Sequence, residues 1–265
     1  MLTLMDTSDL NSFISARSAW LDTALGKHLY ELECQLSSQA LSQVFGWQLL
    51  QIGAWGSDTQ LIAGARTQRK ALVVPETAGR GVAEMTIRSR LDSLGIATHS
   101  IDAVLLPHTL EQVSYPHELL REVERILLGD GQLVLFGFRP LSAWGLRNFL
   151  RANGLPPGTQ QYFSEHRIRD WLRLLGFEVI ESRRYLFNLP VGSPSPRTRR
   201  LLESLGNRFW PLLAGAYMLR ARKRLYTVTP IRTPVWAPSQ PVGGLLESGT
   251  RMQLTDKPSN SSLPE

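Results

Sequence analysis

The stretch IDAVLLPHTLEQVSYPHELLREVERILLGDGQLVLFGF, residues 101–138, decides the fold. It opens with an apolar run that ends at Pro107 and closes with another from Gln132 to Phe138. Between them, Tyr115-Pro116 predicts the start of a helix with one apolar face, because proline suits the first helical position. The Gly129-Asp130-Gly131 segment is predicted to stop that helix. Two apolar strands joined by a helix indicate parallel pairing in a sheet covered on both faces.

Further elements extend this unit in both directions along the chain. Before it lie a helical pattern at 21–45, strands at 47–52 and 70–75, and a weaker strand pattern between 80 and 94. After it lie helical patterns at 144–151 and 166–175 and two long strands within 176–187 and 216–228. Strands that alternate with helices predict a doubly wound α/β domain.

The composition is that of a folded protein without disulfides. The chain has 265 residues, of which 43% are hydrophobic and 20% charged, and a net charge of +6. Cys34 is the only cysteine, which excludes an intramolecular disulfide and a multi-cysteine zinc site. The acidic start lacks the features of a signal peptide, and the apolar stretch at 209–219 is too short to span a bilayer. We expect a cytoplasmic protein.

Three regions are expected along the chain. Residues 1–20 form an N-terminal extension, and residues 21–228 form the main domain with its lead-in helices. From residue 229 to residue 265 the chain is rich in Ser, Thr and Pro and has no helical or strand period. That composition predicts a disordered tail.

The turn after the first strand, QIGAWGSD, is the first candidate site. In an open α/β sheet, ligands bind beyond the carboxyl ends of the strands. Gly53 lies where the backbone would approach a ligand closely, and the amides of Gly56 and Ser57 would face a carboxylate or phosphate. Two glycines in such a turn also serve simple chain reversal, so spacing alone leaves both interpretations open.

The 101–138 stretch closely resembles the second half of the class I S-adenosylmethionine-dependent methyltransferases. The matching features are Asp102 at the start of the fourth strand, Pro107-His108 after it, the Arg125-Ile126-Leu127 triplet and the Gly129-Asp130-Gly131 turn. With LPHTLE and GFRPLSAWGLR, residues 21–227 resemble a bacterial branch of the type 11 methyltransferase-domain family. The resemblance implies a mostly parallel, Rossmann-like sheet with an antiparallel final strand, and S-adenosylmethionine as cofactor.

The resemblance also implies a set of cofactor-binding residues. These are Gly53, Ala54, Trp55, Gly56 and Ser57 in the turn, Glu76 for the ribose hydroxyls, Asp92 for the adenine, and Pro107 and Glu111 after the fourth strand. The chain departs from the family pattern at three places. Gln51 replaces the acid before the glycines, Trp55 replaces a glycine, and Arg90 stands where the adenine-contacting acid is expected.

His108 is the candidate catalytic residue. As a base near neutral pH, it would take a proton from an oxygen or nitrogen nucleophile during in-line attack on the methyl group. Alternatively, a neutral imidazole orients the loop through hydrogen bonds. Glu111 either orients His108, contacts cofactor amino groups or caps the local turn. A metal site is not expected, because a proline interrupts any common helix between His108 and His117.

Two later segments bear on the acceptor. Phe138, Arg139, Trp144 and Arg147 follow the fifth strand, where related enzymes close over the acceptor, and their chemistry suits an anionic or planar molecule. A basic run from Arg197 to Arg224 allows contact with nucleic acid or an anionic membrane surface, although a strand with outward-facing basic residues is the simpler explanation.

The predicted function is methyl transfer from S-adenosylmethionine to an unidentified nucleophile, with a small molecule favoured as acceptor. The alternative is a non-catalytic binding or regulatory protein built on a methyltransferase fold. The departures from the family pattern at Gln51, Trp55 and Arg90 favour this alternative.

Overall fold

The computed structural model describes residues 15–56, 60–75, 85–140, 142, 157, 159, 161–186 and 214–224. All of them fall within residues 1–226, the first of two units into which the chain divides. The predicted tail and the predicted helix at 144–151 lie outside the described residues. In the described part of the chain, no helix has the length and hydropathy needed to cross a membrane.

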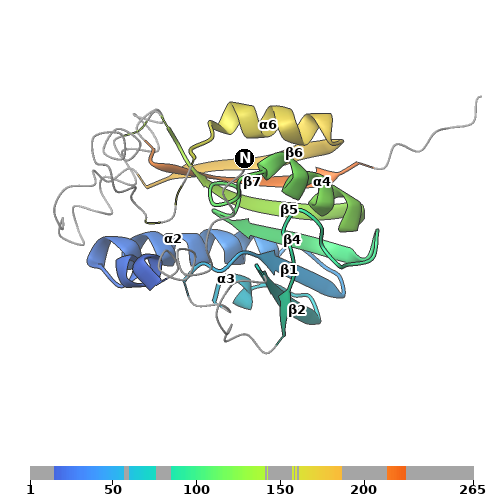
Figure 1. The fold of residues 1–265 in the computed structure, drawn as a ribbon, viewed down its shortest axis with the longest axis horizontal. Coiled ribbons are helices and arrows are strands. Elements are labelled where there is room, and N and C mark those ends of the chain that lie inside the picture. The colour runs from blue at the N-terminus through green and yellow to red at the C-terminus, as the bar shows by residue number, and fades with distance from the viewer. Residues whose placement is uncertain are drawn as a thin grey trace, which may run out of the picture. The chain divides into compact units, whose positions relative to one another are not determined.

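A seven-stranded sheet forms the centre of the domain, in the order β3-β2-β1-β4-β5-β7-β6 (Figure 1). The strands are β1 (Gln48–Ile52), β2 (Arg69–Val74), β3 (Thr86–Arg88), β4 (Ile101–Pro107), β5 (Leu127–Phe138), β6 (Phe177–Tyr185) and β7 (Ala216–Lys223). The pairs among β1 to β5 are parallel, whereas β7 runs antiparallel to both β5 and β6. The structure confirms the predicted fold class.

Helices cover both faces of this sheet. They are α2 (Ala24–Leu41), α3 (Gln60–Ala63), α4 (Pro116–Ile126) and α6 (Glu165–Leu174), and residues 15–21 are also helical. Figure 1 shows α2 on the opposite side of the sheet from α4 and α6. The alternation along β4 explains this, since Ala103 and Leu105 join the core beneath α2, whereas Val104 and Leu106 join the core beneath α4 and α6.

The predicted boundaries hold at the start of α4 and fail at its end. Pro116 occupies the first turn, as expected. The prediction that Gly129-Asp130-Gly131 stops the helix is wrong, because α4 ends at Ile126 and β5 begins directly at Leu127. Leu127 already pairs with Ile101, and an irregularity between Ile101 and Ala103 absorbs the change of register. The glycines therefore lie inside β5, where Asp130 has a left-handed φ of 64°.

The aspartate near the start of β4 fixes the neighbouring strand. Asp102 Oδ2 accepts hydrogen bonds from the backbone N–H groups of Trp47 (2.9 Å) and Gln48 (2.8 Å). The register that follows pairs Gln51 with Leu105. As a result, β1 and β4 reach the same edge of the sheet together.

Four cations of the predicted basic run are described, and each is paired with a carboxylate. Arg220 pairs with Glu181, Lys223 with Glu124, and Arg222 and Arg224 with Glu178. The members of the run from 197 to 208 lie outside the described residues. These four ion-paired side chains stabilise contacts between neighbouring elements. Binding of nucleic acid or an anionic membrane by the basic run stays a prediction.

Candidate active site

The ends of β1 and β4 meet at the glycine turn. Gly53 has a left-handed φ of 94°, and its N–H donates to the carbonyl of Val73 (2.8 Å). Thr109, two residues after β4, donates its hydroxyl to the carbonyl of Ile52 (2.5 Å). A Cβ on Gly53 would lie 2.6 Å from Thr109 Oγ1, so only glycine permits this approach. The turn and the loop after β4 thus form one packed unit.

Trp55 turns inward from this loop. Its side chain is 1% exposed, and its ring centroid lies 4.4 Å from that of His108. Gly56 follows with a φ of 66°, and a Cβ there would collide with the ring of Tyr30 on α2. Ala54 packs against Leu72 and Val74 of β2. The turn is therefore held between α2 and two strands.

His108 lies at the centre of a buried polar cluster. Directly after Pro107, the last residue of β4, it adopts a left-handed φ of 53°, which is uncommon for a residue with a side chain. Its Nδ1 lies 3.0 Å from Glu111 Oε2, and its Nε2 lies 2.7 Å from Glu33 Oε1. The ring stacks on Phe138 with centroids 4.1 Å apart. Both ring nitrogens are thus engaged by carboxylates.

Glu33 on α2 is the residue that sequence analysis missed. Its carboxylate accepts hydrogen bonds from Trp55 Nε1 (2.6 Å) and Tyr185 Oη (2.9 Å), in addition to its contact with His108. A signal was present, because Glu33 lies four residues after Leu29 and four before Ser37, on the buried stripe of α2. A carboxylate at such a position requires buried partners.

Glu111 joins the cluster to β5. One carboxylate oxygen faces His108, and the other accepts a hydrogen bond from the backbone N–H of Phe138. Of the three roles predicted for Glu111, the geometry supports orientation of His108. Gln112 adds a bond from its Nε2 to the carbonyl of His108 (3.0 Å), and Arg17 Nη1 donates to Gln112 Oε1. The loop after β4 is fixed from several sides.

The charges in the cluster determine its protonation. Burial by itself lowers the pKa of His108, but the charges of Glu33 and Glu111 and their hydrogen bonds outweigh burial and raise the pKa to about 9. Burial raises the pKa of Glu111, against the opposing effect of His108. Burial also raises the pKa of Tyr185 well above its ordinary value. With a carboxylate within 3.0 Å of each ring nitrogen, we expect His108 to be protonated at neutral pH and to donate from both nitrogens.

The other predicted site residues divide into three groups. The first group lies at the edge of the sheet where β1 and β4 end, and it comprises Gly53, Ala54, Trp55, Gly56 and Pro107. Asp92 lies between β3 and β4, and a hydrogen bond from Arg90 lowers the pKa of its carboxyl. Among the described residues, no contact joins Asp92 to the buried cluster around His108. Ser57 and Glu76 lie outside the described residues, as do Trp144 and Arg147. In the described part of the chain, no group of His, Cys, Asp and Glu has metal-site geometry.

Similar proteins indicate the family and the fold of the chain. The model of the methyltransferase domain family matches residues 57–135. The uncharacterized protein YafS of Escherichia coli K12 is 32% identical over 221 residues, which cover 82% of this chain and 85% of YafS. The chain belongs to the same family as YafS, and it contains a methyltransferase domain.

Two solved methyltransferase structures show the same fold. A methyltransferase from Thermotoga maritima aligns with a TM-score of 0.57 at 17% identity, over 81% of this chain and 98% of that one. A methyltransferase from Archaeoglobus fulgidus aligns with a TM-score of 0.51 at 15% identity, over 74% and 94% of the two chains. At these identities the likeness concerns the fold alone.

The methyltransferase family implies S-adenosylmethionine as cofactor, and the turn after β1 meets part of what this ligand requires. Gly53 and Gly56 supply the left-handed backbone of the loop. Gln51 Oε1, at the position of the family acid, is buried without a hydrogen-bond partner among the described residues, and it can accept from a ligand donor. Trp55 covers His108. The described residues thus fit a ligand held along the turn, with His108 shielded behind Trp55.

Proposed function

We propose that the chain transfers the methyl group of S-adenosylmethionine to a small-molecule acceptor at the edge where β1 and β4 end. The observation that carries this proposal is the close packing of Gly53 against Thr109, which joins the glycine turn to the loop that holds His108. In an α/β sheet, this edge is where ligands bind. The proposed cofactor contacts are residues 53–57, Glu76, Asp92, Pro107 and Glu111.

The chain's own residues would contribute alignment and a dry environment. When bound, the cofactor supplies a methyl group already activated by its sulfonium, so positioning and exclusion of water are the main requirements. Trp55 and Phe138 are fully buried against His108 next to the turn, so they exclude water from this region.

In this proposal, His108 is a positioning residue. An imidazolium that donates from both nitrogens has no lone pair with which to accept a proton. It instead holds Trp55 and the loop after β4 in place through Glu33 and Glu111. The general-base role predicted from the sequence is the alternative, and it requires a neutral imidazole released from one carboxylate.

Calorimetry and methyl incorporation test the proposal together. Purified protein is titrated with S-adenosylmethionine and S-adenosylhomocysteine, and extracts are then screened for methyl transfer from labelled cofactor. We expect saturable binding of both ligands and incorporation into a low-molecular-weight fraction. Folded protein that binds neither ligand at millimolar concentration would overturn the proposal.

His108→Asn separates the two roles of the histidine once an acceptor is found. If His108 is a base, turnover falls by about 10²–10⁴-fold and the pH dependence of the imidazole disappears. If His108 positions the loop, the main change is in cofactor affinity and stability, and the pH profile of turnover keeps its shape.

The second candidate function is a non-catalytic binding protein on the methyltransferase fold. Trp55 favours it, because the indole fills buried space at a position where the family has glycine. Trp55→Gly is the discriminating variant. Cofactor binding that appears only in this variant would support the non-catalytic function.

A further inference from the structure

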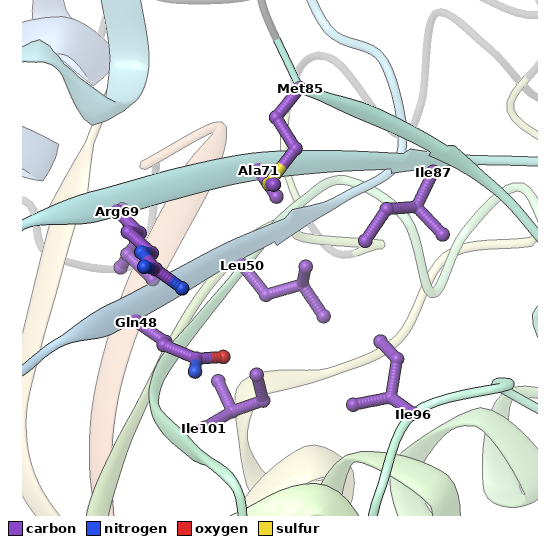
Figure 2. Close-up of a pocket in the computed structure, with 9 residues that line it drawn as sticks. Gln48, Leu50, Arg69, Ala71, Met85, Ile87, Ile96 and Ile101 are labelled. Carbon is purple, nitrogen blue, oxygen red and sulfur yellow. The ribbon is translucent and has the colours of Figure 1, made fainter.

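An apolar pocket opens at the other end of β1 from the candidate active site. It has a volume of about 180 Å³ and lies on the face of the sheet that carries α4 and α6. Figure 2 shows Gln48 and Arg69 on one side of it, Ile87 and Ile96 on the other, and Leu50 between them. The pocket is thus formed mainly by β1, β2 and β3, away from the glycine turn.

In the part of the chain that the structure describes, no helix covers this part of the sheet. Residues 89–100, which connect β3 to β4, form turns and one isolated bridge instead of a helix. Leu94 and Ile96 from this connection pack against the core, but Met85 remains 51% exposed at the rim. Apolar strand surface is therefore left accessible beside β3.

The lining combines an aliphatic interior with one cationic end. Six aliphatic residues and Met85 supply the apolar surface, and the aliphatic residues are Leu49, Leu50, Ala71, Ile87, Ile96 and Ile101. The polar side chains are Gln48 and Arg69, and among the described residues no acid lines the pocket. Arg69 is exposed, and within the described residues its guanidinium has no ion pair. This arrangement complements an alkyl chain with an anionic head.

The surroundings strengthen the preference for a negative charge. The described loops before β1 and β2, residues 42–47 and 64–68, carry Arg66 and no acid. Asp102, the acid nearest in sequence to the lining residue Ile101, is engaged by two backbone N–H groups. Among the described lining residues, Arg69 carries the only charge, and its field acts over about 10 Å at 0.1 M salt.

We propose that this pocket binds a small anionic amphiphile, an unbranched aliphatic carboxylate, with its chain against Leu50, Ile87 and Ile96 and its carboxylate at Arg69. The volume is comparable to the roughly 150 Å³ of a cavity that accommodates benzene, so a chain of about six carbons fits. The site is independent of methyl transfer, because it uses none of the residues assigned to that reaction.

The test uses the full chain with butanoate, hexanoate and octanoate, and with hexan-1-ol and hexylamine as neutral and cationic controls. Isoleucine methyl resonances report the site directly. We expect hexanoate to shift the methyl signals of Ile87, Ile96 and Ile101, with affinity rising about three- to fourfold per added methylene until the pocket is full. Hexylamine should bind more weakly than hexanol.

Substitutions test the contact with the ligand's carboxylate and the contact with its alkyl chain separately. Arg69→Gln should lower hexanoate affinity about tenfold and leave hexanol affinity unchanged, whereas Arg66→Gln, a matched change at the same edge, should alter hexanoate affinity less than threefold. Ala71→Phe should abolish binding by filling the pocket, and Ile87→Ala should weaken it if the first variant does not fold. Equal binding of hexylamine and hexanoate would overturn the proposal. Methyl shifts outside the pocket, or binding seen only with anionic vesicles, would do so as well.

Discussion

Glu33→Gln tests the buried cluster most directly, because it changes the charge and leaves the volume nearly unchanged. In the native protein, Glu33 Oε1 faces His108 and Tyr185, and Oε2 accepts from Trp55. A glutamine that keeps its oxygen toward His108 turns its own N–H₂ toward the indole N–H. Two donors then face each other in a site that is 1% exposed.

The expected cost follows from these contacts. Loss of a hydrogen bond to a charged acceptor costs about 1.5–3 kcal/mol, and a buried donor without a partner costs about 1–3 kcal/mol. The imidazolium also loses one of its two counter-charges, although Glu111 remains. We expect the free energy of unfolding to fall by about 3 kcal/mol, which corresponds to roughly 6–12 °C in Tm for a domain of this size.

Urea denaturation at pH 7 measures the loss, with Glu31→Gln as the matched control. Glu31 is exposed on the same helix, so its substitution should change stability by less than about 0.5 kcal/mol. If Glu33→Gln costs no more than the control, Glu33 does not accept these hydrogen bonds as a buried carboxylate. The description of the cluster would then be wrong.

Three further predictions concern neighbouring features. The folded pKa of His108 is raised from 6.5 to about 9, so its contribution to stability is fully present below pH 6.5 and is lost as pH rises through 9. The free energy of unfolding should therefore fall by about 2 kcal/mol between pH 7 and pH 9. Denaturation of His108→Asn at several pH values should show that most of this pH dependence is gone. Gly53→Ala should destabilise the fold by about 1–3 kcal/mol in thermal unfolding, because it places a Cβ at positive φ against Thr109. The control Gly95→Ala should be nearly neutral, because the space around Gly95 is open. Asp102→Ala should cost about 1–3 kcal/mol in the same assay, because two backbone N–H groups lose their acceptor; an unchanged Tm would show that water replaces it.

Much of the fold follows from local patterns in the chain. The apolar run at 101–107 and the amphipathic spacing of α4 predict a parallel strand–helix–strand unit, and the structure contains it. The end of α4 was misplaced because the Gly129-Asp130-Gly131 motif has the composition of a turn, whereas pairing of Leu127 with Ile101 draws this segment into β5. Pairing with a distant strand overrides the local propensity there.

The candidate site was only partly predictable. His108 and Glu111 were found because they follow the end of a strand, where ligands bind in this fold. Glu33 was not, because its partners Trp55, His108 and Tyr185 lie far along the chain and helical spacing alone does not identify them. Trp55 was recognised as a departure from the family pattern, but its inward orientation depends on the carboxylate that sequence analysis missed.

The position of Tyr185 has a consequence for the order in which the chain folds. Tyr185 lies on β6, and β6 joins the sheet only through β7, which is made last. Glu33 and Tyr185 are 152 residues apart, so at about 5–20 residues per second the tyrosine leaves the ribosome roughly 8–30 s after the glutamate. Throughout that interval Glu33 lacks one of its buried donors and is better solvated by water. We therefore expect the buried cluster around Glu33 to be completed late in synthesis, and a nascent chain halted before residue 216 should lack the strand through which Tyr185 joins the sheet.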